Sequence, residues 1–422
     1  MWRNRNVWIV LTGEFIAGLG LWTATIANLE FMQRLVPSDF LKSVILFVGL
    51  FAGVLLGPLA GRIIDTTRKK TVLLYAGIGR LLSLGLMFIA LATDSIAWMV
   101  AFMIALQIAA AFFFPALQAV LPIIVPEKQL ITLNGAHMNA STLSRILGTA
   151  LAGIMLTVMS LTDLYLVSVA GYAFLVVATF FLHTEEEEKG LHVAKSRQTR
   201  EGSEEGTRKE ASSKPDKSGF KEMIPLLKGM PMVAMLLLLA VIPTLFIGGF
   251  NLMVIGVSEL QHDSTIKGIL YAAEGTSFIV GAFLVKRLSS NGPLLRRLLL
   301  FAFLVAIAHL SLFFGDSKPF AIASFALFGF SAGCFYPLIA AYFQTEVPRE
   351  YHGRFFSFRN MLDRVLTQVI LLSTGFFLDT IGLQWMAVVF GSLSMLMVLT
   401  ATRFSRRFFG KGSSQQVEID IQ

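Results

Sequence analysis

The stretch 57–70, GPLAGRIIDTTRKK, lies between two long apolar segments of the chain. An apolar run from Val44 to Leu56 precedes it, and a second run from Val72 to Leu91 follows it. Inside the stretch, one acid is followed closely by three bases. The chain leaves an apolar environment for a few charged residues and then re-enters it. This pattern indicates a short loop between two membrane-spanning helices.

The composition of the whole chain supports this interpretation. Of the 422 residues, 55% are hydrophobic and only 15% are charged, whereas a soluble domain has about a quarter of its residues charged. A single soluble core cannot hide this much apolar surface, so lipid must cover much of it. A spanning helix needs about 20 apolar residues. The sequence predicts twelve spans, at about 7–29, 41–63, 71–92, 97–121, 132–159, 163–183, 231–257, 265–285, 294–314, 319–345, 355–378 and 382–402.

The basic residues of the loops predict the orientation. An even number of spans places both termini on one side of the membrane. Leaving out the segment 184–230 between the two halves, seventeen Lys and Arg residues fall on that side, against four on the other side. Because cytoplasmic loops are enriched in Lys and Arg, we expect both termini in the cytoplasm of a multi-pass protein of the bacterial inner membrane. The net charge of +8 then requires no nucleic-acid partner.

The chain divides once. Residues 184–221 are polar, nearly balanced in charge and rich in Gly and Ser, which predicts a disordered cytoplasmic linker. It separates an N-terminal six-helix bundle, 1–183, from a C-terminal one, 222–404, and a cytoplasmic tail follows at 405–422. The stretch 281–297, GAFLVKRLSSNGPLLRR, occupies in the second half the place of 57–70 in the first. Two six-helix halves are typical of transporters.

The opening stretch resembles the loop motif of the major facilitator superfamily, Gly-x-x-x-Asp-x-x-x-basic-basic, through Gly61, Asp65, Lys69 and Lys70. It departs from that motif at Thr66, where Arg is usual, and at Arg68, where Gly is usual. Three further segments resemble the branch of macrolide-efflux proteins and the enterobactin exporter: FFFPALQAVLPIIVPEKQL at 112–130, SRILGTALAG at 144–153 and GRFFS at 353–357. In the second of these, Thr149 stands where Pro is usual.

The resemblance implies an all-α membrane protein with twelve transmembrane helices in two pseudo-symmetric six-helix bundles. It also implies that Asp65 holds a cytoplasmic gate shut by facing the start of the eleventh span across the two halves. The candidate gate residues are Gly57, Gly61, Asp65, Arg68, Lys69, Lys70, Gly353 and Arg354. The alternative is an ordinary turn with a basic anchor. Small residues at 57, 60 and 61 would let another helix approach closely.

Charged residues inside the spans are the second signal, because they are costly in lipid and usually face protein or water. The candidates for proton coupling are Glu14, Arg145, Glu274 and Asp363. Arg145 and Glu274 lie near the middle of spans that the resemblance makes neighbours, so we expect them to pair. A purely structural bridge is the alternative. Arg80 is expected to snorkel and His137 to be structural.

Polar or aromatic residues on the cavity helices of this fold are candidates for substrate contact: Trp22, Asn28, Gln107, Asn251 and Tyr336. Each could instead form a hydrogen bond between helices. The sequence holds no phosphate loop, no Cys/His metal spacing and no nucleophile elbow. We therefore expect no enzymatic activity, no metal and no cofactor, with a proton gradient as the source of energy.

These features predict a secondary active transporter that works by alternating access. The resemblance favours proton-coupled export of a hydrophobic or amphiphilic small molecule, such as a drug, an antibiotic or a siderophore-like compound. An uptake symporter or a lipid flippase of the same fold is one alternative, and a non-transporting membrane sensor or scaffold is another. The expected partners are the small-molecule substrate and the lipid bilayer, and the protein is expected to be a monomer.

Overall fold

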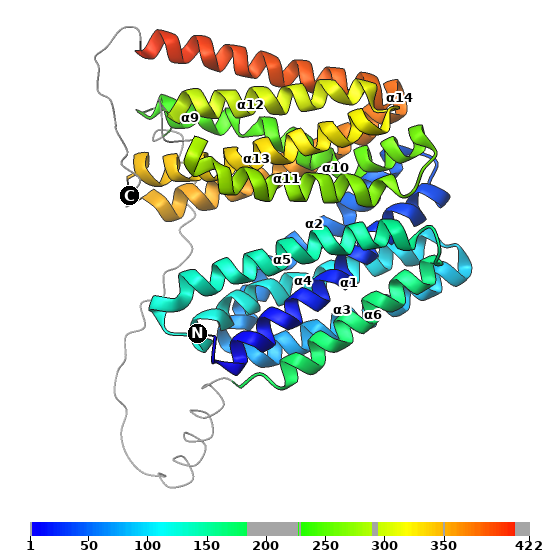
Figure 1. Ribbon diagram of the computed structural model, residues 1–422. Coiled ribbons are helices and arrows are strands. Elements are labelled where there is room, and N and C mark those ends of the chain that lie inside the picture. Colours follow the sequence, from blue (N-terminus) through cyan, green and yellow to red (C-terminus); the bar gives the residue numbers. More distant parts are fainter. Residues whose placement is uncertain (1, 184–226, 228, 289–293, 349–350, 410–422) are drawn as a thin grey trace, which may run out of the picture. The chain divides into compact units, whose positions relative to one another are not determined.

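The computed structural model describes residues 2–183, 227, 229–288, 294–348 and 351–409, and every element in that part of the chain is helical (Figure 1). The predicted linker at 184–221 lies outside the described residues, and so does the end of the predicted tail, 410–422.

The first half of the chain forms six helices, each of them close to one predicted span: α1 (Arg5–Leu35), α2 (Asp39–Thr66), α3 (Lys69–Thr93), α4 (Ile96–Ile124), α5 (Glu127–Met155) and α6 (Leu161–Phe180). Polar side chains cap three of these helices. Asn4 Oδ1 accepts from the Asn6 amide, and Ser38 Oγ accepts from the Leu41 amide. Ser160 and Asp163 form a reciprocal capping box at the start of α6. These caps satisfy backbone N–H groups that the first helical turn leaves without partners.

The second half is also helical, and one of its spans differs in detail from the prediction. The span predicted at 231–257 consists of α9 (Pro231–Leu239) and α10 (Val241–Gln261). Pro243 has no N–H to offer the carbonyl of Leu239, which explains the interruption at Ala240. The remaining helices are α11 (Ile266–Leu288), α12 (Leu294–Ser311), the 3-10 turn η1 (Leu312–Phe314), α13 (Lys318–Glu346) and α14 (His352–Phe409).

The segment labelled α14 consists of two helices that meet at a kink, and they correspond to the last two predicted spans. Gly382 interrupts it with a φ of 76° and a ψ of 171°, values that a residue without a Cβ adopts at little cost. The apolar stretch Phe358–Ser405 has 48 residues, roughly 72 Å of helix, which is more than twice the ~30 Å core of a bilayer. The chain therefore crosses the membrane twice here.

Ten described helical segments are long and apolar enough to cross a membrane. One of them is the double pass of α14, and α5 is not among the ten because polar residues lower its hydropathy. Counting α14 twice and adding α5 gives the twelve passes that the sequence predicts. The fold class is confirmed: an all-α membrane protein with two sets of six helices.

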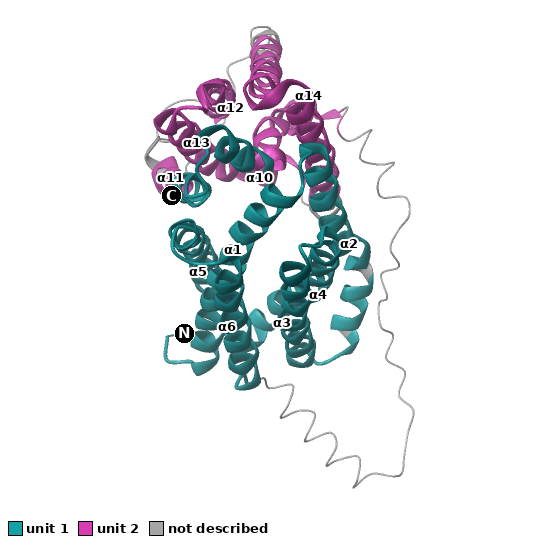
Figure 2. Cartoon of the chain, turned by 90° about the vertical axis from the view of Figure 1, so that its right-hand side faces the viewer, with its two compact units in different colours: residues 1–214, 251–275 teal, residues 215–250, 276–422 magenta. Residues whose placement is uncertain are grey.

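The structure divides into two compact units (Figure 2). Unit 1 comprises residues 1–214 and 251–275, and unit 2 comprises 215–250 and 276–422. In unit 1, α1 packs along α5 and α6, while α4 packs along α2 and α3. Unit 1 also holds the hairpin formed by the end of α10 and the start of α11. In unit 2, α12 packs against α13 and α14, and Phe246 stacks on Phe328 with ring centroids 4.0 Å apart.

Candidate functional site

The centre of the candidate site is an ion pair between α5 and α11, inside unit 1. Arg145 Nη1 donates a hydrogen bond to Glu274 Oε2, although 129 residues separate the two in the chain. The Glu274 side chain is 8% exposed and that of Arg145 is 21% exposed. The contact that the sequence predicts is therefore present. Its role in proton coupling remains a prediction.

Glycines allow α5 and α11 to come this close. A Cβ on Gly275 would lie 2.6 Å from Ile146 Cγ1, so a side chain there would push the helices apart. Near the other end of the contact, a Cβ on Gly153 would lie 2.9 Å from the Cα of Gly268. Backbone approach of this kind is characteristic of small residues at the contacts of membrane helices. The glycines place the Arg145 and Glu274 side chains within reach of each other.

Aromatic and amide groups surround the ion pair. The guanidinium carbon of Arg145 lies 5.9 Å from the centroid of the Trp22 ring, and the Trp22 ring lies 6.1 Å from that of Tyr271. Tyr271 Oη donates a hydrogen bond to Asn251 Oδ1. Four helices thus contribute to one group, which we call the Arg145–Glu274 cluster: Trp22, Arg145, Asn251, Tyr271 and Glu274.

Four of these five residues are candidates from the sequence, and Tyr271 is the one that sequence reasoning missed. The signal was available: Tyr271 precedes Glu274 by three residues, so both lie on one face of α11. The cluster offers an indole, a phenol and a carboxamide beside one ion pair. Such a surface can hold an amphiphilic solute by stacking, by apolar contact and by hydrogen bonds.

Other substrate candidates have different neighbours. Asn28 Oδ1 accepts a hydrogen bond of 2.5 Å from Tyr165 of α6, which fits a contact between helices. The backbone of Gln107 in α4 approaches Gly53 of α2. Tyr336 belongs to unit 2, where its ring lies 6.0 Å from that of Phe335. Asp363, also in unit 2, lies 3.6 Å from Arg359, one turn away. Their proposed roles stay predictions.

The candidate gate residues are described only in part. Among the described residues, no atom lies within 4 Å of the position that a Cβ would take on Gly57 or Gly61. Their role in the gate stays a prediction. Arg68 is the N-cap of α3, whose first two residues are Lys69 and Lys70, and Lys70 Nζ lies 6.0 Å from the Phe180 ring centroid. The side chains of Asp65 and Arg354 lie outside the described part of the structure, as does any side-chain contact at position 353.

A second ionic group joins the ends of α1 and α2 to the α10–α11 hairpin, also within unit 1. Lys42 Nζ lies 2.8 Å from Asp39 Oδ1 and 2.7 Å from Glu259 Oε1. Lys267 Nζ lies 2.8 Å from both Glu30 Oε2 and Ser258 Oγ. The Lys42 side chain is 1% exposed and that of Lys267 is 0% exposed. Both lysines lie at the very start of predicted spans, 41–63 and 265–285, and the sequence gives no signal that they are buried and paired.

The chemistry of these groups is that of exchangeable ion pairs. A buried carboxylate that pairs with a guanidinium releases it when it gains a proton, because a neutral acid has no net charge to hold. Within the described residues, no group of three His, Cys, Asp or Glu could hold a metal ion.

Comparison with known protein families gives one match that covers most of the chain. Residues 10–367 match the sequence profile of the Major Facilitator Superfamily. Macrolide efflux protein A of Streptococcus pyogenes is 22% identical over 387 residues, which cover 88% of this chain and 89% of that protein. The MFS-type transporter YfiS of Bacillus subtilis (strain 168) is 23% identical over 418 residues, covering 94% of this chain and 93% of that protein.

Solved structures show the same architecture. The nucleoside transporter NupG aligns with a TM-score of 0.71 and 12% identity, over 95% of this chain and 99% of that chain. A bacterial homolog of the human lysosomal transporter Spinster aligns with a TM-score of 0.64 and 14% identity, over 97% of this chain and 99% of that chain. At these identities the likeness is one of fold.

Proposed function

Because the chain belongs to the major facilitator superfamily of membrane transporters, we propose that it exports a hydrophobic or amphiphilic small molecule in exchange for protons. The protein is a multi-pass transporter of small molecules and not an enzyme. For the membrane, we propose the bacterial inner membrane with both termini in the cytoplasm, from the excess of Lys and Arg on that side.

The substrate class is supported by a relative and by the site. Macrolide efflux protein A is similar over nearly the whole chain, although its identity of 22% is low. In the Arg145–Glu274 cluster, Trp22 and Tyr271 offer large ring surfaces, and Asn251 offers an amide. Aromatic rings bind the apolar body of a solute, while the amide and the ion pair select its polar groups. A macrolide-like compound has both kinds of surface.

The observation that carries the coupling proposal is the Arg145–Glu274 hydrogen bond between α5 and α11. When Glu274 is ionised, the pair ties the two helices together. When Glu274 binds a proton, Arg145 loses its anionic partner, and the helices are free to separate during the alternating-access cycle. In each cycle, a proton would bind from outside the cell and be released into the cytoplasm, and a substrate molecule would move in the opposite direction.

Export can be tested in everted membrane vesicles from cells that overproduce the protein, with a panel of radiolabelled macrolides and other amphiphiles. The proposal expects the energised vesicles to accumulate at least one compound and to release it when an uncoupler collapses the proton gradient. Accumulation in right-side-out vesicles instead would indicate uptake. Saturable binding of panel compounds without flux would indicate a sensor. Either result would overturn the proposal of proton-coupled export.

A further inference from the structure

We propose that Glu14 and His137 form a second proton-binding site inside the first bundle, which exchanges protons with the Arg145–Glu274 cluster along the interface of α1 and α5. This inference rests on the proposed proton coupling. Its starting point is a set of buried polar atoms with unmet hydrogen bonds. In the described part of the chain, Glu14 Oε1, His137 Nε2, Arg80 Nε and Tyr172 Oη are all buried and have no hydrogen-bond partner.

The two titratable groups face each other between α1 and α5. Glu14 Oε2 lies 3.7 Å from His137 Nε2, about 1 Å more than a hydrogen bond, so a small rotation of either side chain brings them into contact. The proton would move from the carboxyl of Glu14 to Nε2 of His137, leaving a carboxylate and an imidazolium, and the reverse step restores both neutral groups. Histidine is suited to this step because one ring nitrogen of a neutral imidazole accepts a proton while the other already carries one.

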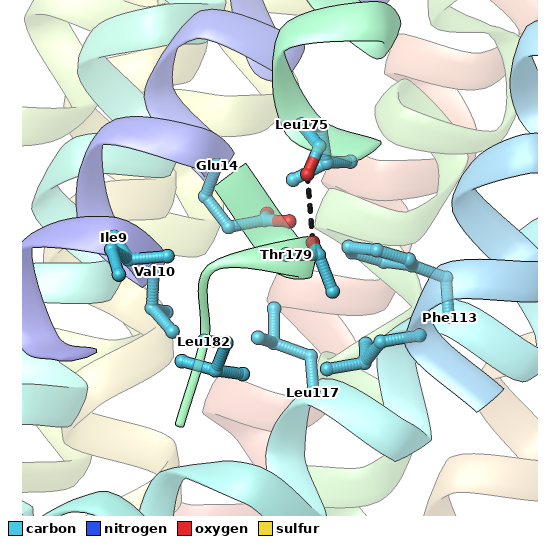
Figure 3. Close-up of a pocket in the computed structure, with 9 residues that line it drawn as sticks. Ile9, Val10, Glu14, Phe113, Leu117, Leu175, Thr179 and Leu182 are labelled. Atoms are coloured by element: carbon cyan, nitrogen blue, oxygen red, sulfur yellow. Dashed lines mark hydrogen bonds between the residues drawn. The ribbon is translucent and has the colours of Figure 1, made fainter. Parts of the chain in front are cut away.

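A cavity adjoins the carboxyl group. Figure 3 shows the Glu14 side chain extending from α1 toward Leu175 and Thr179 of α6, with Phe113 and Leu117 of α4 on the opposite side. The Thr179 hydroxyl already donates to the Leu175 carbonyl, so it does not hold the Glu14 carboxyl. The remaining lining of the cavity is apolar. Glu14 therefore meets no fixed donor there and can gain or lose a proton without breaking a hydrogen bond.

A buried cation compensates the charge of Glu14 without forming an ion pair with it. Arg80 of α3 is 3% exposed and thus does not snorkel, contrary to the expectation from the sequence. Its guanidinium carbon lies 4.1 Å from the Phe113 ring centroid and 4.8 Å from that of Phe114. The aromatic rings hold Arg80, and Glu14 acts on it only through its electric field. An isolated buried carboxylate would be far more costly.

The charged and titratable groups around Glu14 are thus few. They are His137 from α5, Arg80 from α3 and the phenol of Tyr172 from α6, while α4 presents only apolar side chains to the cavity. One acid, one imidazole and one fixed cation form a site that can hold a single exchangeable proton. A structural salt bridge would instead show the acid and the guanidinium in hydrogen-bond contact.

The interface of α1 and α5 connects this site to the Arg145–Glu274 cluster. Glu14, Gly18 and Trp22 lie on one face of α1, one turn apart. Gly18 faces the buried hydroxyl of Ser144, and Trp22 packs on Gly148 of α5. The two sites are therefore roughly 12 Å apart along the helices, with Ser144 between them. We take this interface, with the Ser144 hydroxyl at its middle, as the path by which a proton released from Glu274 would reach His137.

The test compares Glu14→Gln and His137→Gln with the parent in proteoliposomes, using the macrolide that the vesicle assay identifies. Thr12→Val is the control, because this residue of α1 is exposed and its hydroxyl donates to the Trp8 carbonyl of the same helix. The proposal expects gradient-driven transport to fall at least tenfold in both variants, while substrate exchange without a gradient stays within twofold of the parent. The control should match the parent in both assays.

A second measurement detects the proton itself and needs no substrate. Infrared difference spectra of the purified protein should show a carboxyl band that grows on acidification, disappears in Glu14→Gln and changes its pH midpoint in His137→Gln. Gradient-driven transport within twofold of the parent in both variants would overturn the proposal, and so would the absence of a Glu14 band that titrates. If transport by the parent protein does not respond to a pH gradient, the proposed proton coupling is wrong. The infrared measurement still decides whether Glu14 binds a proton.

Discussion

At the scale of single residues, the Arg145–Glu274 pair is the feature whose removal should be most informative. Arg145→Ala leaves the buried Glu274 carboxyl without its partner, which typically costs about 3–5 kcal/mol of unfolding free energy when the acid stays charged. Glu274→Gln keeps a hydrogen-bonding group of the same size and should cost less. The double variant Arg145→Ala/Glu274→Gln has no stranded charge, so its thermal stability in detergent should recover above that of Arg145→Ala.

Recovery of stability in the double variant would show that Arg145 and Glu274 stabilise the protein by interacting with each other. If the double variant is as unstable as the sum of the two single variants, the two side chains do not interact, and the ion pair contributes nothing to stability.

A second residue-scale prediction concerns Glu30, which binds two cations of very different exposure. Lys267 is 0% exposed, whereas Arg34 is 59% exposed and lies 2.9 Å from the same carboxylate. Lys267→Met should lower the unfolding free energy by several kcal/mol, because it breaks a buried pair. Arg34→Met should change it by less than about 1 kcal/mol, since an exposed pair is weak. Equal losses in chemical unfolding of the two variants would contradict the role assigned to burial.

At the scale of the elements, the contact of α5 with α11 depends on glycine. A Cβ on Gly153 would lie 2.9 Å from the Cα of Gly268 and 3.1 Å from the carbonyl oxygen of Thr265. Both neighbours are backbone atoms, so Gly153→Ala must move one helix and should cost about 1–3 kcal/mol. Gly135→Ala on the same helix is the control, because no described atom lies within 4 Å of its Cβ position.

Thermal unfolding in detergent measures both glycine variants. The control should be neutral or slightly stabilising, since alanine favours a helix over glycine by up to about 1 kcal/mol. A Gly153→Ala variant as stable as Gly135→Ala would show that α5 and α11 do not meet through their backbones.

The helices also show which structural features the sequence predicts and which it does not. Long apolar runs predict nearly every helix, because crossing a bilayer demands length and hydropathy from each segment by itself. The break at Ala240 was missed, since it depends on one missing N–H, whereas the kink at Gly382 lies where the sequence predicts that the last two spans meet. The ion pair of Arg145 with Glu274 was predictable because an unpaired charge inside a membrane span is costly, which favours an oppositely charged neighbour. The burial of Lys42 and Lys267 was not, because a lysine at the end of a span can extend its charged group into water.

At the scale of the whole molecule, the segment 184–221 joins the two sets of helices and has no apolar face in its sequence. We predict that a Gly/Ser linker of equal length leaves export in everted vesicles within about twofold of the parent, because such a chain keeps a similar reach. Loss of export in a protein that still inserts would contradict this and would assign the segment a regulatory role.

The central claim is that protonation of Glu274 couples the transport cycle to the proton gradient. The most direct measurement compares the parent and Glu274→Gln in proteoliposomes, for substrate exchange without a gradient and for accumulation driven by a pH gradient. We predict that the variant keeps exchange, because glutamine mimics the protonated acid, but loses gradient-driven accumulation at least tenfold and binds substrate independently of pH. Gradient-driven accumulation by Glu274→Gln at the parent rate, with the parent's pH dependence, would contradict the account.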